Sequence, residues 1–289
     1  MVQIIIAWTD NQLVEPLGSL YRTSSNMLSC KLYNKLDKLD YLCYTVIMTI
    51  ASQIKQRVNK LPPGYLSSYT EFLDVSQAKQ EDIIKALNRL VEQNIIKKIA
   101  KGKYYKPEQT PFGELPPSQY EIVKDILGSK NKPLGYLTGL SIYNSLGLTS
   151  QLSYTIQIGK NDIRPSLQRG KYRVTFVKQK NQITKSNIPL LQTLDSIKNI
   201  TKIPDSTIEA SCTRFKDILK QCEQKQISLM CKLSFKYPPS TRALLGALLE
   251  QANIPFDKIE LKGTLNPITR YTLTDVKSAL PNYMNWNLV

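Results

Sequence analysis

The side chains whose types and spacing favour a specific chemistry lie between residues 67 and 103. Lys85 and Arg89 are four residues apart, so on a helix they share one face. Arginine can form two hydrogen bonds with guanine, asparagine and glutamine can do the same with adenine, and lysine neutralises phosphates. We therefore predict a DNA-binding site made of these residues: Ser67, Ser68, Gln77, Lys79, Gln80, Lys85, Asn88, Arg89, Lys101, Gly102 and Lys103.

Each part of this predicted site has a simpler alternative. Asp82 and Glu92 stand on the same segment as Lys85 and Arg89, and mixed charges of this kind are typical of any solvated helix face. The winged helix that the periodicity predicts below is a module that can also serve protein contacts alone. Both alternatives stay open at the level of sequence.

Catalytic chemistry has little support in the residue types. The 289 residues include no histidine, which excludes Ser-His-Asp and Cys-His nucleophile pairs and histidine-containing zinc sites. The five cysteines contain no C-x-x-C pair and favour reduced core thiols. Pro204-Asp205 and Glu223-Gln224-Lys225 fit a nuclease-like pattern, but acid-x-Lys recurs at Glu260 and Asp275 and both halves fall in helical patterns. We expect no catalytic residue, metal or cofactor.

The charge balance favours a polyanionic partner. The chain carries 39 Lys and Arg against 23 Asp and Glu, a net charge of +16. Residues 48–106 hold eleven cations and five anions, a net +6 in 59 residues, whereas residues 107–289 hold +10 in 183. No run approaches the roughly 18 apolar residues of a membrane span, and the first residues make a poor signal peptide, so we expect a cytoplasmic protein.

The elements that would position these cations follow from periodicity. Ile50, Ile54, Val58 and Leu61 mark one face of a helix that Pro62 ends. Ser68 and Glu71 form the capping-box pattern of a short second helix. Ile83, Leu87, Leu90 and Val91 mark a third helix, and residues 95–106 predict a hairpin with a Lys-Gly turn. Three helices followed by a two-stranded wing predict a winged helix-turn-helix.

The pattern of the whole chain predicts an α+β protein, with the winged module followed by a mixed α/β domain. We expect an N-terminal extension at 1–47 that precedes a native start at Met48, the winged module at 48–106, a proline-rich stiff linker at 107–117, the α/β domain at 118–250 and a C-terminal segment at 251–289. The predicted helices cover 119–127, 137–146, 208–221, 241–251 and 274–280. The predicted strands cover 152–158, 172–177 and 258–261.

Two segments carry a family resemblance. Residues 86–91 (Ala-Leu-Asn-Arg-Leu-Val) and 96–107, which run from Ile96 to Pro107 through Lys101-Gly102-Lys103, resemble the N-terminal domain of AbiEi-type antitoxins. The resemblance continues through 113–118 and 139–151, where Leu-Gly-Leu-Thr-Ser-Gln at 146–151 is similar to the second-domain signature, and it covers about residues 49–250. The family's usual glycine after the third helix is Asn94 here, a residue that tolerates the same left-handed backbone.

The resemblance implies a bacterial autorepressor and antitoxin of a type IV toxin–antitoxin, or abortive-infection, system for phage defence. Its partners would be its own promoter and a nucleotidyltransferase toxin, with Lys79, Lys85, Arg89, Lys101 and Lys103 at the basic positions of the DNA-binding domain. A homodimer on an inverted repeat is a further hypothesis. The alternatives are a metal-dependent nucleic-acid-cleaving defence enzyme and a stand-alone winged-helix regulator.

Overall fold

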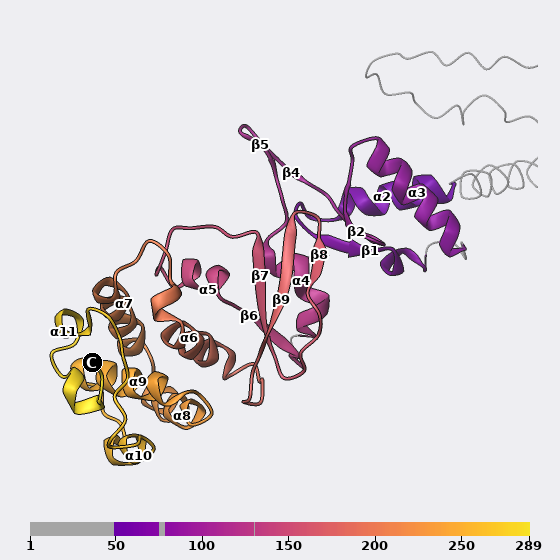
Figure 1. Cartoon of the computed structure of the whole chain (residues 1–289). Coiled ribbons are helices and arrows are strands. Elements are labelled where there is room, and N and C mark those ends of the chain that lie inside the picture. The colour runs from indigo at the N-terminus through magenta and orange to yellow at the C-terminus, as the bar shows by residue number, and fades with distance from the viewer. Residues whose placement is uncertain (1–48, 75–78, 130) are drawn as a thin grey trace, which may run out of the picture. The chain divides into compact units, whose positions relative to one another are not determined.

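The computed structural model describes residues 49–74, 79–129 and 131–289 (Figure 1). The described part is a mixed α+β fold, as the sequence predicts, and Ile50–Val289 form one unit. The predicted extension at 1–47 and the predicted start at Met48 lie outside the described residues.

The first module contains every element predicted for it and one that was not. It runs through the helix α2 (Ile50–Lys60), the strand β1 (Leu66–Ser68), the 3-10 helix η1 (Tyr69–Phe72), the helix α3 (Gln80–Glu92) and the strands β2 (Lys97–Ala100) and β3 (Lys103–Tyr105). The three strands form an antiparallel sheet in the order β1-β3-β2. The strand β1 is the unpredicted element, because three residues are too few to show a period.

The apolar stripe of each helix closes the core of this module. Ile54 and Val58 of α2 pack with Ile83 and Leu87 of α3, all four fully buried. After α3, Asn94 takes a left-handed backbone with φ 58°, a conformation that asparagine tolerates at the end of a helix.

The stretch predicted as a stiff linker, 107–117, contains a β-hairpin. The strands β4 (Glu108–Thr110) and β5 (Gly113–Leu115) pair as an antiparallel hairpin, with Thr110 opposite Gly113. The four prolines stand outside these two short strands, where they remove no ladder hydrogen bond.

A four-stranded sheet follows the hairpin. It is preceded by α4 (Gln119–Leu127) and contains β6 (Gly135–Thr138), β7 (Thr155–Lys160), β8 (Leu167–Arg169) and β9 (Tyr172–Lys178), in the order β6-β7-β9-β8. The strands β7 and β9 are parallel and the other pairs are antiparallel. The helix predicted at 137–146 is corrected, because β6 extends to Thr138 and only α5 (Leu140–Ser145) is helical, after Gly139 at φ 70°.

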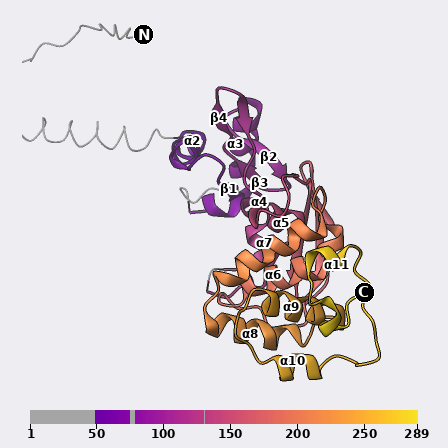
Figure 2. The same cartoon turned by 90° about the vertical axis from the view of Figure 1, so that its left-hand side faces the viewer.

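Helices build the remainder of the chain (Figure 2). They are α6 (Ile188–Lys198), η2 (Ile200–Lys202), α7 (Ile208–Lys220), α8 (Gln224–Ser234), α9 (Pro239–Gln251), α10 (Lys258–Gly263), α11 (Val276–Ala279) and η3 (Tyr283–Trp286). The helix α9 contacts α6, α7, α8, α10 and η3, and its residues 243–249 are all buried. A helix that is apolar all round belongs at the centre of a core. Within the described residues, no helix combines the length and the apolar character that crossing a bilayer requires.

Two predictions for the C-terminal segment are corrected. Residues 258–261 are the start of α10 and not a strand, because the Asp257 side chain caps this helix by accepting from the Glu260 N–H at 2.8 Å. The segment 251–289 also belongs to the core of the preceding domain, since Leu261, Leu280 and Trp286 are buried in the same cluster as α9.

Glu250 ties this segment to α9. Its carboxylate accepts hydrogen bonds from Trp286 Nε1 at 2.7 Å, from Asn282 Nδ2 at 2.9 Å and from the Lys258 ammonium. Burial alone would raise the pKa of Glu250, but these donors outweigh burial and lower the pKa to about 2.

The first module shares a core with the sheet. Leu66 of β1 and Ile99 of β2 pack in one cluster with Ile122 of α4 and Ile156 of β7. Asp125 of α4 accepts from Arg169 Nη2 at 2.8 Å, and also from Lys103 of β3, as described below. Residues 107–117 therefore do not separate two independently packed domains.

Candidate nucleic-acid interface

The helix α3 presents two of the predicted cations to solvent. Lys85 and Arg89 are exposed, on the side of the helix opposite the buried Ile83, Leu87 and Leu90. The Lys85 ammonium lies 3.9 Å from Asp82, at the limit of an ion pair, and its side chain remains 69% exposed. Burial of Lys85 and Arg89 would have excluded a nucleic-acid contact through this face, and neither residue is buried.

The start of α3 adds two further predicted residues. Lys79 is the N-cap residue, Gln80 is the first residue of the helix, and both are exposed. The positive end of the helix dipole lies at this position, and Glu81 and Asp82 of the first turn already place two carboxylates beside it. Gln77, also predicted for the site, lies outside the described residues.

Asn88 has a different role from the one predicted. It is half-buried, and its Oδ1 accepts a hydrogen bond from the Tyr104 hydroxyl at 3.2 Å. Tyr104 is 1% exposed, and burial raises its pKa, which keeps the hydroxyl protonated as a donor. The oxygen of Asn88 therefore holds α3 against β3, so the side chain is not free to pair with adenine.

The two serines do not form the predicted phosphate contact together. Ser67 is 3% exposed and its hydroxyl donates to the Tyr104 carbonyl oxygen at 3.2 Å, so it is withdrawn from solvent. Ser68 is half-buried at the N-cap of η1, where its N–H donates to Glu71 Oε1 at 3.0 Å, as the capping pattern predicts.

The hairpin tip separates the two lysines predicted to act together. Lys101 is exposed, and Gly102 turns the chain with φ 69°. Lys103 faces the other way, because its ammonium donates to Asp125 Oδ2 at 2.9 Å and its side chain is 22% exposed. A Cβ on Gly102 would lie 2.8 Å from Cδ1 of Tyr69, so the tip rests on η1.

Other cations of the module are held in ion pairs and are therefore less available to a phosphate. Arg57 donates two hydrogen bonds to Asp74, at 2.6 and 3.0 Å, and these lower the pKa of the Asp74 carboxyl. Lys97 pairs with Glu114 of the β4–β5 hairpin. Lys98, in contrast, is exposed on β2 and was missed, because a Lys-Lys run does not tell which lysine faces solvent. The exposed cations on α3 and the β2–β3 hairpin are Lys79, Lys85, Arg89, Lys98 and Lys101, hereafter the basic face.

Residues of the nuclease-like pattern are engaged at helix ends. Asp205 accepts a hydrogen bond from Gln151 Nε2 at 2.6 Å shortly before α7, and Glu223 is the N-cap residue of α8. Among the described residues, no three His, Cys, Asp or Glu side chains come together as a metal site.

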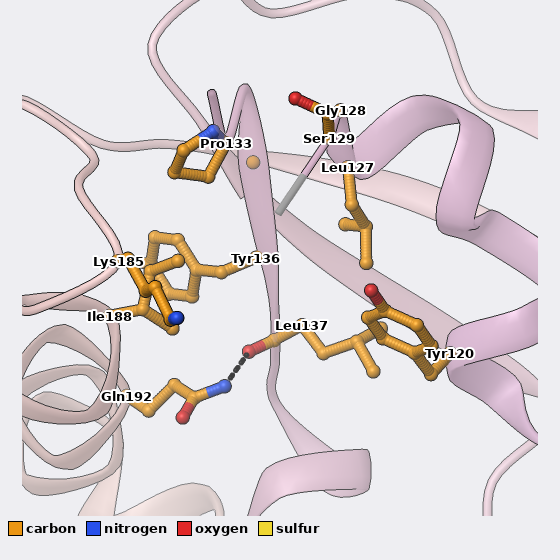
Figure 3. Close-up of a pocket in the computed structure, with 11 residues that line it drawn as sticks. Tyr120, Leu127, Gly128, Ser129, Pro133, Tyr136, Leu137, Lys185, Ile188 and Gln192 are labelled. Carbon is orange, nitrogen blue, oxygen red and sulfur yellow. Dashed lines mark hydrogen bonds between the residues drawn. The ribbon is translucent and has the colours of Figure 1, made fainter. Parts of the chain in front are cut away.

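A pocket of about 390 Å³ lies between α4, β6 and the start of α6 (Figure 3). Tyr120 and Leu127 of α4 lie on one side of β6, and Lys185 and Ile188 lie on the other. Its only hydrogen bond drawn in the figure runs from Gln192 Nε2 to the Leu137 oxygen at 3.0 Å. The walls are largely apolar, and no sequence pattern indicates this pocket.

A model of the DUF6088 family, a family of unknown function, matches residues 53–227. The chain belongs to this family. The match to DUF6088 begins in α2 and ends in α8, so it includes the whole basic face. No curated protein is similar enough to this DUF6088 member to count as a match.

A solved structure is similar in fold. The crystal structure of the RV2827C protein from Mycobacterium tuberculosis aligns with a TM-score of 0.52 and 13% sequence identity, over 78% of this chain and 85% of that chain. At this identity the likeness concerns the fold alone.

Proposed function

We propose that residues 50–106 form a winged helix-turn-helix that binds double-stranded DNA, and that this DUF6088 protein is a transcriptional regulator. The order of elements supports the proposal: α2, β1, η1 and α3 precede a β2–β3 hairpin whose second strand lies at the centre of the sheet. The α3 helix would be the recognition helix and the hairpin would be the wing.

The observation that carries the proposal is the exposure of Lys85 and Arg89 on α3, together with Lys101 at the hairpin tip. A helix in the major groove presents its outer face to base edges, where Arg89 can pair with guanine. Lysines beside it gain affinity by neutralising phosphates and releasing counterions, whatever the base sequence.

The experiment is a selection of duplexes from a random library, alongside binding to the fragment upstream of the protein's own gene. The wild-type protein enriches a motif, and Arg89→Ala loses the preference at one or two positions of that motif. Arg270→Ala, which removes an exposed arginine outside the module, keeps the motif. Binding without any preference, or an Arg89→Ala variant with the wild-type motif, contradicts the assignment of α3.

The second part of the proposal is autorepression and an antitoxin role, and it rests on the AbiEi resemblance alone. The Leu-Gly-Leu-Thr segment that carries the resemblance is packed into the fold: Leu148 is buried in the core of the helical part and Arg214 Nε donates to the Leu146 oxygen at 2.6 Å. The test is co-expression with a nucleotidyltransferase encoded beside the gene. Restored growth supports the antitoxin role, whereas unchanged toxicity, or the lack of such a neighbour, leaves a stand-alone regulator. A footprint over two half-sites would support a homodimer on DNA.

A further inference from the structure

A second basic surface surrounds a cavity far along the chain from the basic face. The cavity has a volume of about 510 Å³ and lies between the end of β9, the C-terminal part of α6 and the α8–α9 turn. Four exposed lysines line it: Lys178, Lys180, Lys198 and Lys236. They come from three separate elements, so no single solvated helix face explains why they gather here.

The floor of this cavity is a buried polar network centred on Asp195. The carboxylate is 7% exposed and accepts hydrogen bonds from the hydroxyls of Tyr136 at 2.7 Å, Thr138 at 2.9 Å and Tyr237 at 2.8 Å. Gln179 Nε2 donates to both tyrosine oxygens, at 2.7 and 2.9 Å. Buried networks of this kind are rigid when each member has a partner.

This network leaves one polar position for a ligand. A carboxylate offers about four acceptor positions, and the three hydroxyls use three of them. Two of these bonds fall on Oδ2 and one on Oδ1, so Oδ1 can accept a further hydrogen bond. Asp195, Gln179 and Tyr237 all line the cavity.

The topology also favours a ligand at this place. The strands β7 and β9 are parallel, and Lys178 is at the carboxyl end of β9. The carboxyl ends of two parallel strands lie at the same edge of a sheet, so Lys160 and Lys178 end β7 and β9 at one edge. Pro238 and Pro239, at the N-terminus of the 13-residue helix α9, complete the lining, and the positive end of a helix dipole favours an anion.

We propose that this cavity binds a small molecule with two or more phosphate groups, of the nucleoside polyphosphate class. The lysines take the phosphates, the Phe235 and Tyr237 side chains line the space for the organic part, and Asp195 Oδ1 accepts from a ligand N–H or O–H. The volume falls within the range of ligand pockets, roughly 300 to 1,000 Å³. This site goes beyond the proposed DNA binding and does not depend on it.

Calorimetry on the full chain at low salt, without DNA, tests the proposal with ATP and inorganic pyrophosphate as probes. We expect both to bind, ATP more tightly, and the Lys178→Ala/Lys198→Ala variant to bind each at least about tenfold more weakly. The matched control, Lys232→Ala/Lys262→Ala, removes two exposed lysines from α8 and α10 and keeps wild-type affinity. All four side chains are exposed, so these variants are expected to fold.

Lysine acetylation followed by mass spectrometry gives an independent measurement. ATP protects Lys178, Lys198 and Lys236 from acetylation and leaves Lys262 reactive. The proposal is overturned if neither probe binds at millimolar concentration, if the two double variants weaken binding equally, or if Lys178→Ala/Lys198→Ala lowers affinity for duplex DNA but not for ATP. The last result would assign these lysines to nucleic acid. A failure with ATP and pyrophosphate leaves the DNA-binding proposal untouched, because that proposal is measured on other residues.

Discussion

Lys101 and Lys103 flank the same glycine, yet the DNA-binding proposal gives them opposite expected roles. Lys101 is exposed at the hairpin tip, whereas Lys103 is held by Asp125. Replacing either lysine with alanine removes one positive charge from the same hairpin. The two variants therefore control for each other's net charge, and they differ in whether the charge can reach a phosphate.

The expected magnitude follows from counting cations on the basic face. With Arg89 directed at a base, four lysines remain for phosphates, and each contributes about −0.9 to the slope of log K against log salt. The wild-type slope is then about −3.6, which corresponds to a loss of affinity of about 150-fold between roughly 50 and 200 mM salt. Lys101→Ala reduces the slope to about −2.7 and this loss to about 40-fold.

Lys103→Ala keeps the wild-type slope. Its effect is on folding, because Asp125 retains Arg169 but loses one cation from a partly exposed cluster. We expect a loss of about 1 kcal/mol or less in the free energy of unfolding. Fluorescence anisotropy over a salt series measures the slopes, and urea denaturation measures the stability. A slope that falls for Lys103→Ala as much as for Lys101→Ala would refute the assignment of the hairpin surface.

Three further predictions concern the β2–β3 hairpin and the C-terminal core. Gly102→Ala should weaken duplex binding severalfold, measured by anisotropy. Its φ of 69° disfavours any side chain, and a Cβ at this position would lie 2.8 Å from the Tyr69 ring. Gly246→Ala should cost about 1–3 kcal/mol in urea denaturation, since its Cβ would lie 2.2 Å from the Trp286 ring, whereas Gly263→Ala, with open space around it, should be close to neutral. Glu250→Gln should cost about 2 kcal/mol in the free energy of unfolding at neutral pH. The lowering of the folded pKa from 4.5 to about 2 corresponds to about 3.4 kcal/mol, and solvent screening of the half-exposed Lys258 partner reduces that value. That difference should shrink as pH falls from about 4.5 towards 2, where the folded carboxyl takes up its proton; a gap independent of pH would contradict the assigned role of the ion pair.

Local patterns predicted the elements of the first module well. The apolar stripe of α3, the Ser68 and Glu71 capping pattern and the left-handed Asn94 are each decided by neighbours in sequence, so they are visible without a structure. The β4–β5 hairpin was hidden by its prolines, which suggest a linker although they stand outside the strands. The helix α10 was missed because Ile259 is β-prone and suggested a buried strand. In the structure Ile259 is 88% exposed, and the Asp257 cap decides the helical conformation.

The candidate site was less predictable because distant residues decide which cations are exposed. Lys103 is removed by Asp125 of α4, and Ser67 and Asn88 are each occupied by Tyr104. These pairs are 16 to 37 residues apart in sequence. The charge and period of a single segment carry no information about such partners. The cavity around Asp195 was even less predictable from the sequence, because its lysines come from elements that only the fold brings together.

The most direct test of the central claim is duplex binding by the wild-type protein and by Lys85→Ala/Arg89→Ala. Both are measured by anisotropy on a labelled duplex of about two helical turns that contains the selected motif. The charge-matched control is Lys262→Ala/Arg270→Ala, which changes two exposed cations outside the module. We predict that the wild type and the control bind alike and that the α3 variant loses at least about 30-fold in affinity, since one base contact and one phosphate contact disappear. A wild-type protein that does not bind the duplex, or an α3 variant that binds as well as the control, would contradict the account.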